Sequence, residues 1–589
     1  MFRAILNVAF LVGTAFLIHR AIVDFAGRDI YLYRFLALFA WRYIRFFINF
    51  IAFWCYKPSP KPRKPRFQPQ RDVTCIIPTV DPEGAGFRET LTAVAANRPA
   101  KLIVVTVGDV LYKKAEPIIQ EFKEANKDIE YVLLQVSQAN KRVQVAHAVP
   151  QVNTPITVLL DDHVYFGPQF LESMLYPFED HWVGLVGTNK RVRRKQGTDL
   201  RGSIWNMLGA IYLYRHNFEI RATNTIDGGV FVVSGRSCAI RSEILQRKDF
   251  LKGYTNERFF FGLFGPLNAD DDNYITRYVV RDGWDIKIQY TEATVMETDI
   301  GVEEPLEKKF LGQCLRWVRT TWRSNSCSLF TDRTVWSRQP YCVYAVYLTS
   351  FTNFALFTDA ALLYFFVRSS WLSLAGLLKL LLWIFFTKTV KVFDYYRCNP
   401  RDIYLFPVQV AFAYFHSLIK LYALLTFYST DWSGRQLDKL TVNVKANGTT
   451  LDVEAGKESL PPSPTDEDRF RPTAYESAQH PHIALVRNLT RTTLNLRARQ
   501  SAHIKSYQKA LLEELPKLRA ELEKLLTENQ VVIANNEQIA ELVTAVADLI
   551  KDVLGKTKDI EGEKEGELGK SILGLKKTVE DIEARWAAG

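Results

Sequence analysis

The sequence predicts an α/β domain inserted between apolar helices of membrane-spanning length and followed by a helical tail. Short β-branched runs separated by helical stretches are typical of a parallel sheet, and they occur at Val73–Pro78, Leu102–Val107 and Ile156–Leu160. Apolar, aromatic-rich segments flank these runs, and 13% of the 589 residues are aromatic. The mean hydropathy of −0.08 shows that a large polar part accompanies the apolar segments. The tail is rich in Glu, Lys, Leu and Ala.

The composition excludes a disordered or fibrous chain, because 48% of the residues are hydrophobic. The net charge of +11 could indicate nucleic-acid binding, but six basic and no acidic residues fall within the Pro-rich stretch 57–71, beside an apolar segment. A basic collar next to a membrane explains that stretch better, so we expect a lipid bilayer and no nucleic acid as partner. The seven Cys form no C-x-x-C pair and fit a reducing compartment.

Two apolar segments within residues 1–56 predict a transmembrane hairpin. Ala4–Ile18 is mostly apolar, with a signal peptide as the alternative. Ile30–Tyr56 is long enough to cross a bilayer of roughly 30 Å. Its arginines fall on one side of a helix, which indicates either an interfacial helix or a span facing a polar channel; they are Arg34, Arg42 and Arg45. With the basic linker 57–71 in the cytosol, the domain that follows is cytosolic.

The α/β domain is expected at residues 72–305, and amphipathic helices at the membrane surface at 306–338. Membrane segments are expected within residues 341–428. Tyr341–Val367 and Trp371–Thr387 are predicted spans, whereas Ile403–Thr426 is either a span or a broken, re-entrant segment.

The remaining chain is expected to hold a polar loop and linker at 429–500 and a helical tail at 501–589. Leucines in the tail repeat at spacings of 3 and 4, which indicates a coiled coil or a small helical bundle; they are Leu511, Leu515, Leu518, Leu522 and Leu525. We expect self-association or partner binding there rather than chemistry.

Two acidic clusters are candidates for the chemistry. Asp161-Asp162-His163 ends a predicted strand, and a carboxylate and an imidazole there could hold a divalent cation; an ordinary acidic turn is the alternative. Asp270-Asp271-Asp272 places three carboxylates in a row, which raises their pKa values and favours a proton acceptor among them. A helix N-cap is the alternative for this second cluster, and both can hold at once.

Two further clusters follow the domain. Gln313, Arg316 and Trp317 lie on one face of a predicted helix, where an Arg can hold a phosphate and a Trp can stack on a sugar ring. Trp432-Ser433-Gly434-Arg435 follows the last apolar segment, and its Trp and Arg could close over a nucleotide. Taken alone, the first reads as an interfacial helix and the second as a turn.

Together, these clusters resemble the processive, membrane-integrated family 2 glycosyltransferases, above all hyaluronan synthases and the hyaluronan-synthase-like fungal type 2 glycosyltransferases. The resemblance extends from about Val73 to Arg435. It implies a GT-A-like nucleotide-sugar transferase domain between transmembrane helices. The sequence departs from the family pattern at His163, where a second Asp is usual, at Arg236 for a Pro, and at Ser433 for a Gly.

The resemblance also implies roles for individual residues. Asp272, with Asp271 beside it, is the catalytic base, and Trp317 and Ser234 bind the acceptor. Asp161 and His163 hold Mg²⁺ or Mn²⁺. The residues that bind the nucleotide sugar are Asp81, Asp109, Lys141 (paired with Arg142), Asp161, Gln313, Arg316, Trp432 and Arg435. Asn217-Phe218-Glu219 and Ser234-Gly235 resemble the acceptor side of the site.

The expected function is inverting, processive transfer from UDP-sugars to a growing polysaccharide, with export across the cell (plasma) membrane by a multi-pass protein whose catalytic domain is cytosolic. Arg42, Arg45 and Asn353 are the expected lining of the export path. One alternative is a non-processive, lipid-linked transferase using dolichyl phosphate, which the Q-x-x-R-W motif disfavours. Another is a degenerate transferase acting as a membrane adaptor, which the complete acidic clusters disfavour. The donor sugar stays open between glucose, N-acetylglucosamine, and N-acetylglucosamine with glucuronate.

Overall fold

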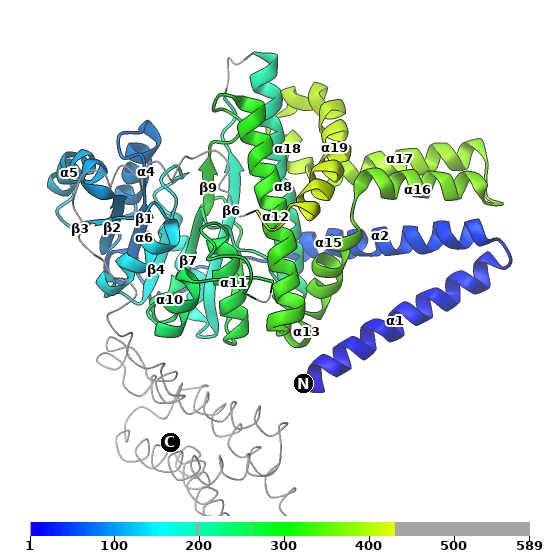
Figure 1. The fold of residues 1–589 in the computed structure, drawn as a ribbon, viewed down its shortest axis with the longest axis horizontal. Coiled ribbons are helices and arrows are strands. Elements are labelled where there is room, and N and C mark those ends of the chain that lie inside the picture. The colour runs from blue at the N-terminus through cyan, green and yellow to red at the C-terminus, as the bar shows by residue number, and fades with distance from the viewer. Residues whose placement is uncertain (1, 196–198, 261, 430–589) are drawn as a thin grey trace, which may run out of the picture. The chain divides into compact units, whose positions relative to one another are not determined.

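A computed structural model describes residues 2–195, 199–260 and 262–429. Within these residues, nine strands form one mixed sheet in the order β3-β2-β1-β4-β7-β6-β9-β5, with β8 paired to β6. Helices cover both faces of this sheet, and further apolar helices extend from it (Figure 1). The strands are β1 (Val73–Pro78), β2 (Lys101–Val107), β3 (Glu130–Val136), β4 (Ile156–Leu160), β5 (Tyr165–Phe166), β6 (Val183–Val192), β7 (Ser237–Arg241), β8 (Asp285–Gln289) and β9 (Val295–Thr298).

The prediction of a parallel sheet is right for one half and wrong for the other. Strands β1 to β4 are parallel and include the three β-branched runs that the sequence shows. Strand β7 then pairs antiparallel with both β4 and β6, and β5 pairs antiparallel with β9. The second half was missed because Gly, Thr, Asn and Lys interrupt the apolar run of β6.

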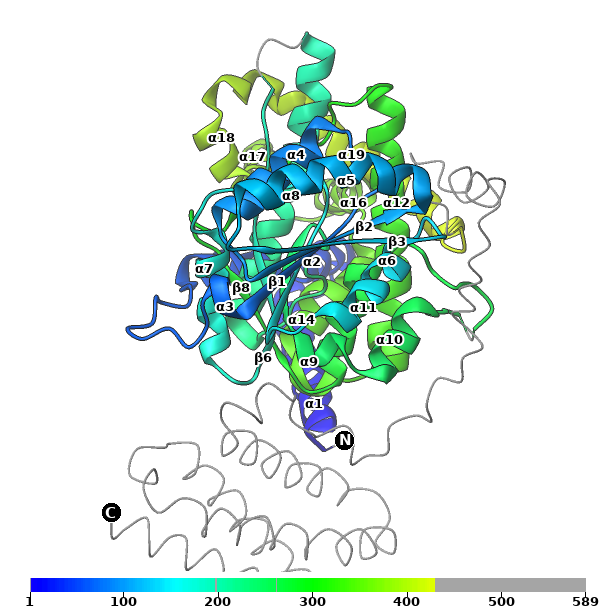
Figure 2. The same ribbon diagram turned by 90° about the vertical axis from the view of Figure 1, so that its left-hand side faces the viewer.

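Two hydrophobic cores lie on the two faces of the sheet, because successive side chains of a strand point to opposite sides. In β1, Ile76 belongs to one core, while Val73, Cys75 and Ile77 belong to the other. Figure 2 shows α4 (Ala85–Ala96) and α5 (Gly108–Ala125) on one face, with α6 (Lys141–Ala148) and α11 (Asp271–Arg281) on the other. The cores fix the carboxyl ends of β1, β2 and β4 along one edge.

The long helices α8 (Leu200–Asp227) and α12 (Leu306–Ser326) join the domain to the apolar helices. The apolar helices are α1 (Phe2–Ala26), α2 (Ile30–Cys55), α16 (Ala355–Arg368), α17 (Leu374–Val390) and α19 (Phe406–Leu425). The shorter helices are α3 (Pro69–Asp72), α7 (Phe170–Leu175), α9 (Ser242–Leu245), α10 (Lys248–Thr255), α13 (Val335–Arg338), α14 (Pro340–Cys342), α15 (Thr349–Thr352) and α18 (Phe393–Cys398).

Three helical stretches in the described part of the chain are long and apolar enough to cross a membrane: Arg3–Ala26, Ile30–Cys55 and Pro400–Leu425. A fourth is added if the pair Pro340–Thr352 and Ala355–Arg368, bent by 84°, counts as one span. The segment Tyr341–Val367, expected as a span, is therefore bent, and Trp371–Thr387 is not among these candidates. The helix is continuous within Ile403–Thr426, so the alternative of a break there is not realised.

The break falls at Asn353, where a distant lysine provides hydrogen bonds to the freed backbone carbonyl groups. Lys420 Nζ, on α19, donates to the carbonyl oxygens of Ser350 and Asn353 at 2.5 and 3.0 Å. Carbonyl groups freed at a helix break need such partners in an apolar environment. The partner lies 67 residues away from Asn353, so local sequence could not reveal it.

Candidate active site

Acidic residues follow three neighbouring parallel strands at the same edge of the sheet. Asp81 comes after β1, Asp109 opens α5 after β2, and Asp161 follows β4. Asp81 and Asp109 are exposed, and Asp109 accepts a hydrogen bond from Gln135 Nε2 at 3.0 Å. This edge is where ligands of open α/β sheets bind.

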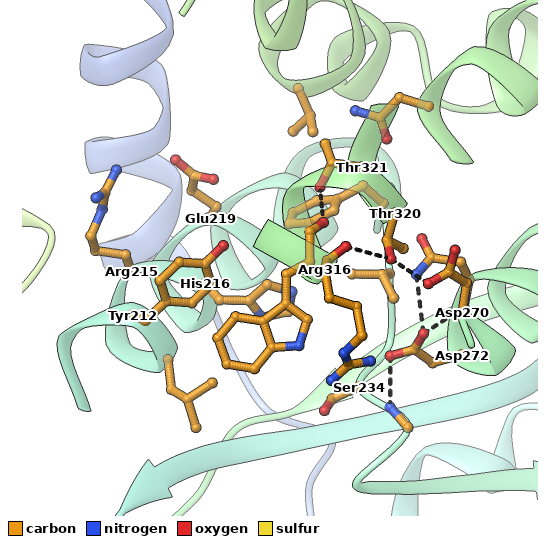
Figure 3. A pocket seen from close by; sticks show the side chains of 18 of the residues that line it. Tyr212, Arg215, His216, Glu219, Ser234, Asp270, Asp272, Arg316, Thr320 and Thr321 are labelled. Atoms are coloured by element: carbon orange, nitrogen blue, oxygen red, sulfur yellow. Dashed lines mark hydrogen bonds between the residues drawn. The ribbon is translucent and has the colours of Figure 1, made fainter. Parts of the chain in front are cut away.

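A cavity of about 330 Å³ lies beside this edge and extends toward the apolar helices. Side chains from α8 and from the α11 and α12 region converge on it (Figure 3). The predicted site residues that line it are Lys141, Asp161, Ser234, Asp271, Asp272, Arg316 and Trp317. Asp81, Asp109, His163 and Gln313 are not part of its lining, and Trp432 and Arg435 lie outside the described residues.

Lys141 joins the two acidic clusters. Its Nζ lies 2.7 Å from Asp161 Oδ1, 3.1 Å from Asp271 Oδ2 and 3.0 Å from the carbonyl oxygen of Gly235. Burial alone would lower the pKa of Lys141, but the carboxylates of Asp161 and Asp271 hold that pKa well above its usual range. The lysine is therefore charged and compensates both carboxylates.

Arg142, expected to form a basic pair with Lys141, does not share this role and is not part of the cavity lining. The Arg142 side chain is fully buried in the core. Its guanidinium donates to the carbonyl oxygens of Tyr254 and Ala269, both at 2.8 Å, and to Glu257 Oε2 at 2.7 Å. Arg142 thus fixes the backbone just before the Asp270–Asp272 cluster instead of facing the cavity.

The three consecutive aspartates have three different environments. Asp270 pairs with Arg323 at 2.6 Å, and Asp271 pairs with Lys141. Asp272 Oδ2 accepts from the backbone N–H of Gly235 at 3.1 Å, and no salt bridge to Asp272 occurs among the described residues. Desolvation and the neighbouring Asp271 carboxylate raise the pKa of Asp272. These are the properties of a proton acceptor.

Helix α12 brings two of its three predicted residues into the cavity. Arg316 and Trp317 line it, whereas Gln313 does not. The Trp317 ring lies 4.8 Å from that of Tyr212, and the Arg236 guanidinium lies 5.4 Å from the Trp317 ring centroid. An indole with a stacked cation and a neighbouring phenol is a flat, amphipathic wall suited to a sugar.

Helix α8 supplies four polar cavity residues, of which only Glu219 lies in a stretch that the sequence analysis singled out. Tyr212, Arg215, His216 and Glu219 line the cavity, and their spacing of three and four residues places them on one helical face. That spacing is the signal that could have found them. His216 Nδ1 lies 2.7 Å from Nζ of the buried Lys190 on β6. Burial and the nearby Arg236 charge lower the pKa of Lys190 to about 7.

Comparison with known proteins identifies the family. A model described as "Glycosyltransferase like family 2" matches residues 69–320. A type 2 glycosyltransferase of Gibberella zeae is 41% identical over 417 residues, which are 69% of this chain and 76% of that protein. The chain belongs to glycosyltransferase family 2. Membership of this family also gives the mixed sheet of the chain a GT-A-like fold.

Other similarities to this family 2 glycosyltransferase are more distant. A hyaluronan synthase of Streptococcus pyogenes is 24% identical over 376 residues, covering 63% of this chain and 84% of the synthase. Among solved structures, a mannosyltransferase from Pyrobaculum calidifontis in complex with GDP-Man and Mn²⁺ gives a TM-score of 0.40 at 14% identity, covering 66% of this chain and 97% of that one.

The donor set of the glycosyltransferase fits a cation that takes most of its ligands from the substrate. In the part of the chain that the structure describes, no group of three or more His, Cys, Asp or Glu side chains could hold a metal. His163 Nδ1 lies 2.8 Å from Asp162 Oδ1, and imidazole is a common ligand of divalent metals. Asp161 adds one carboxylate. Mg²⁺ is commonly held by one or two carboxylates together with substrate phosphates, so the residues present are compatible with it.

The far end of the cavity reaches the apolar helices. Arg45 on α2 lines it and donates to the carbonyl oxygen of Ala345 and to Thr349 Oγ1, both at 2.8 Å. Asn353 and Lys420 line the same end. Arg42, also predicted here, instead forms a salt bridge with Asp359 at 2.6 Å and is not part of the lining.

Proposed function

We propose that this family 2 glycosyltransferase is an inverting, processive polysaccharide synthase that uses UDP-sugars and passes its product through the membrane. The observation that supports it is the extent of one cavity. Its lining runs from Asp272 and Trp317 to Arg45, Asn353 and Lys420. The last three lie on or between helical segments that include the candidate membrane spans.

The chemistry proposed for the site is a single displacement. Asp272 accepts the proton of the acceptor hydroxyl while that oxygen forms a bond to C1 of the donor sugar. The bond between C1 and the diphosphate oxygen breaks, and UDP leaves with the electron pair. One displacement without an enzyme nucleophile inverts the anomeric centre. Mg²⁺ or Mn²⁺ would be held by Asp161 and His163 and would supply neutralisation of the leaving diphosphate.

The chain's own residues supply the rest of the site. Arg316, which lines the cavity, is the proposed contact for the diphosphate, through a charge-assisted hydrogen bond. Lys141 keeps Asp161 and Asp271 in position and adds a positive charge. Trp317, with Tyr212 beside it, is the platform for the acceptor sugar, and Ser234 lies in the same lining. Asp81 and Asp109, at the neighbouring strand ends, are the proposed contacts for the nucleoside.

The proposed location is the plasma membrane, with the α/β domain in the cytosol. Residues at both ends of α19 contact residues that adjoin the α/β domain. Asp402, just before α19, pairs with Arg194 at 2.9 Å, and Ser429, just after it, is bound by Arg319 of α12 at 3.1 Å. We therefore propose that α19 lies against the bilayer without crossing it, although its length and composition would allow it to cross, and that the polar tail begins on the cytosolic side. Self-association through residues 501–589 is the proposed role of the tail.

The experiment uses the full chain in lipid nanodiscs with radiolabelled UDP-glucose, UDP-N-acetylglucosamine and UDP-glucuronate, singly and combined. We expect UDP release together with a polymer that specific glycosidases degrade. The matched control is Asp272→Asn, which should release no UDP above background. A product of one sugar extracted into organic solvent would instead indicate a lipid-linked transferase. Absence of UDP release with every donor would indicate an adaptor and contradict the proposal.

A further inference from the structure

The guanidinium group of Arg323 joins two segments that lie far apart in the chain. Its Nε and Nη2 donate to Asp270 Oδ2 at 3.0 and 2.6 Å. Its Nη1 donates to the carbonyl oxygens of Phe427 and Ser429 at 2.9 and 3.0 Å. The side chains of Arg323 and Asp270 are 4% and 5% exposed, so these contacts form in a desolvated environment where they are strong.

Asp270 controls where the next two carboxylates point. It is the N-cap residue just before α11, with a φ of 67° in the left-handed region, and its carbonyl oxygen accepts from the N–H of Tyr274 at 3.2 Å. A non-glycine residue holds that conformation only when its surroundings impose it. Here the Thr320 hydroxyl and the Arg323 guanidinium, both on α12, hold the Asp270 carboxylate. The first turn of α11, with Asp271 and Asp272, is fixed through this residue.

Arg323 also affects the electrostatics of Asp272. The negative groups that act on Asp272 are Asp271 and Asp270, and Lys141 opposes them. Lys190 and Arg236 are further basic groups near Asp272, and the Asp272 charge raises the pKa of each. Because Arg323 neutralises Asp270 directly, it reduces the repulsion that Asp270 exerts on Asp272.

We propose that Arg323 is a positioning residue of the transferase reaction, which orients Asp272 through Asp270 and ties the end of α19 to the same cluster. The inference rests on the proposed role of Asp272 as the base. Arg319, one turn earlier on α12, is a natural control. It donates to Thr426 Oγ1 and Ser429 Oγ at 3.0–3.1 Å, and Asp270 is not among its hydrogen-bond partners in the described chain.

The experiment measures UDP release by the full chain in nanodiscs with the three UDP-sugars combined, across about pH 5 to 9. We expect Arg323→Gln to lower kcat about 10- to 100-fold, as a displaced catalytic group does. We also expect the acid limb of its kcat profile to move to higher pH, because the uncompensated Asp270 disfavours the ionised base. UDP affinity, measured by calorimetry, should stay at the wild-type value.

Two further variants separate positioning from general destabilisation. Adding Asp270→Asn to Arg323→Gln removes the uncompensated charge, so the acid limb should return to the wild-type pH or below it. Arg319→Gln should leave the acid limb in place. If Arg323→Gln does not fold, Arg323→Lys takes its place. That variant keeps the charge but has three donors on one atom in place of the four hydrogen bonds that the guanidinium makes, so kcat should fall with a smaller shift.

The results that overturn the inference are specific. An acid limb at the wild-type pH in the folded Arg323 variant, or an equal shift in Arg319→Gln, would leave Arg323 with only a structural role. In both cases the proposed function would stand. Absence of UDP release by the wild type would overturn the proposed function and this inference with it.

Discussion

Lys141 Nζ lies 2.7 Å from Asp161 Oδ1 and 3.1 Å from Asp271 Oδ2. A single buried ammonium group therefore links the acidic residue after β4 to the acidic cluster at the start of α11. Removing one partner from such a cluster leaves charges uncompensated, which costs more than the pair itself contributes.

Lys141→Gln should weaken UDP-sugar binding and turnover together, because Asp161 and Asp271 then repel each other and the incoming diphosphate. We expect a loss of about 10-fold or more in UDP affinity, as for a truncated charged contact. Lys141→Arg keeps the charge and should lose less. Isothermal titration with UDP measures both variants, and wild-type affinity in Lys141→Gln would contradict this account of the cluster.

Asp272→Asn should retain nucleotide binding and lose turnover. The amide keeps the shape of the carboxylate and can still accept from the N–H of Gly235, but it cannot take a proton. General-base participation contributes about 10²–10⁴-fold, and kcat should fall by that factor. Asp271→Asn is the neighbouring control, and it should mainly disturb Lys141. Near-normal polymer synthesis by Asp272→Asn would assign the base elsewhere.

The buried Lys190 predicts a specific dependence of stability on pH. Its pKa is about 7 in the folded chain against an ordinary value of 10.5, since burial disfavours the ammonium form. Between these values the unfolded chain binds more protons, so the contribution of Lys190 to stability rises with pH from about 7 to 10.5. Lys190→Met should thus be more stable than wild type below pH 7, with the gap closing as pH rises.

The measurement is the Tm of both proteins in nanodiscs at several pH values. His216→Gln serves as the companion variant, because it removes the imidazole that Lys190 contacts but keeps the lysine. A difference in Tm between Lys190→Met and wild type that does not change with pH would show that Lys190 keeps its ordinary pKa in the folded chain.

How much the sequence could predict depended on whether the determining contacts are local. Strands β1 and β4 were predicted at their observed bounds because their β-branched runs are uninterrupted. The different environments of Asp270, Asp271 and Asp272 could not be predicted from local sequence. Arg323, which pairs with Asp270, lies 53 residues from it, and Lys141, which pairs with Asp271, lies 130 residues from it. The Lys190–His216 pair was missed because its members lie on a strand and a helix 26 residues apart.

The polar tail carries two N-x-T sequons, at Asn447 and Asn488, which test the topology. Because the chain just after α19 contacts α12 beside the Asp270–Asp272 cluster, the tail should begin in the cytosol, where N-glycosylation does not occur. Neither sequon should be modified when the protein is made in a eukaryotic cell. A mass shift after glycosidase treatment would contradict this topology.

Trp317 and Arg316 are adjacent on α12, yet replacing each by Ala should impair a different property of the enzyme. Trp317→Ala removes the proposed acceptor platform beside Tyr212, so polymer formation should be lost while UDP affinity persists. Arg316→Ala removes the proposed charge-assisted contact to the diphosphate and should weaken UDP binding. Helix packing alone predicts another pattern, in which both variants lose expression and thermal stability together and the surviving protein binds UDP normally.

A UDP titration and a polymer assay on the two variants distinguish these readings. Gln313→Ala is the matched control from the same helix, because Gln313 is absent from the cavity lining. It should retain more of both activities than either neighbour, although the sequence motif alone gives the three residues equal weight. Equal UDP affinity in wild type and Arg316→Ala would count decisively against the site as described. Equal losses in all three variants would show that α12 acts through packing.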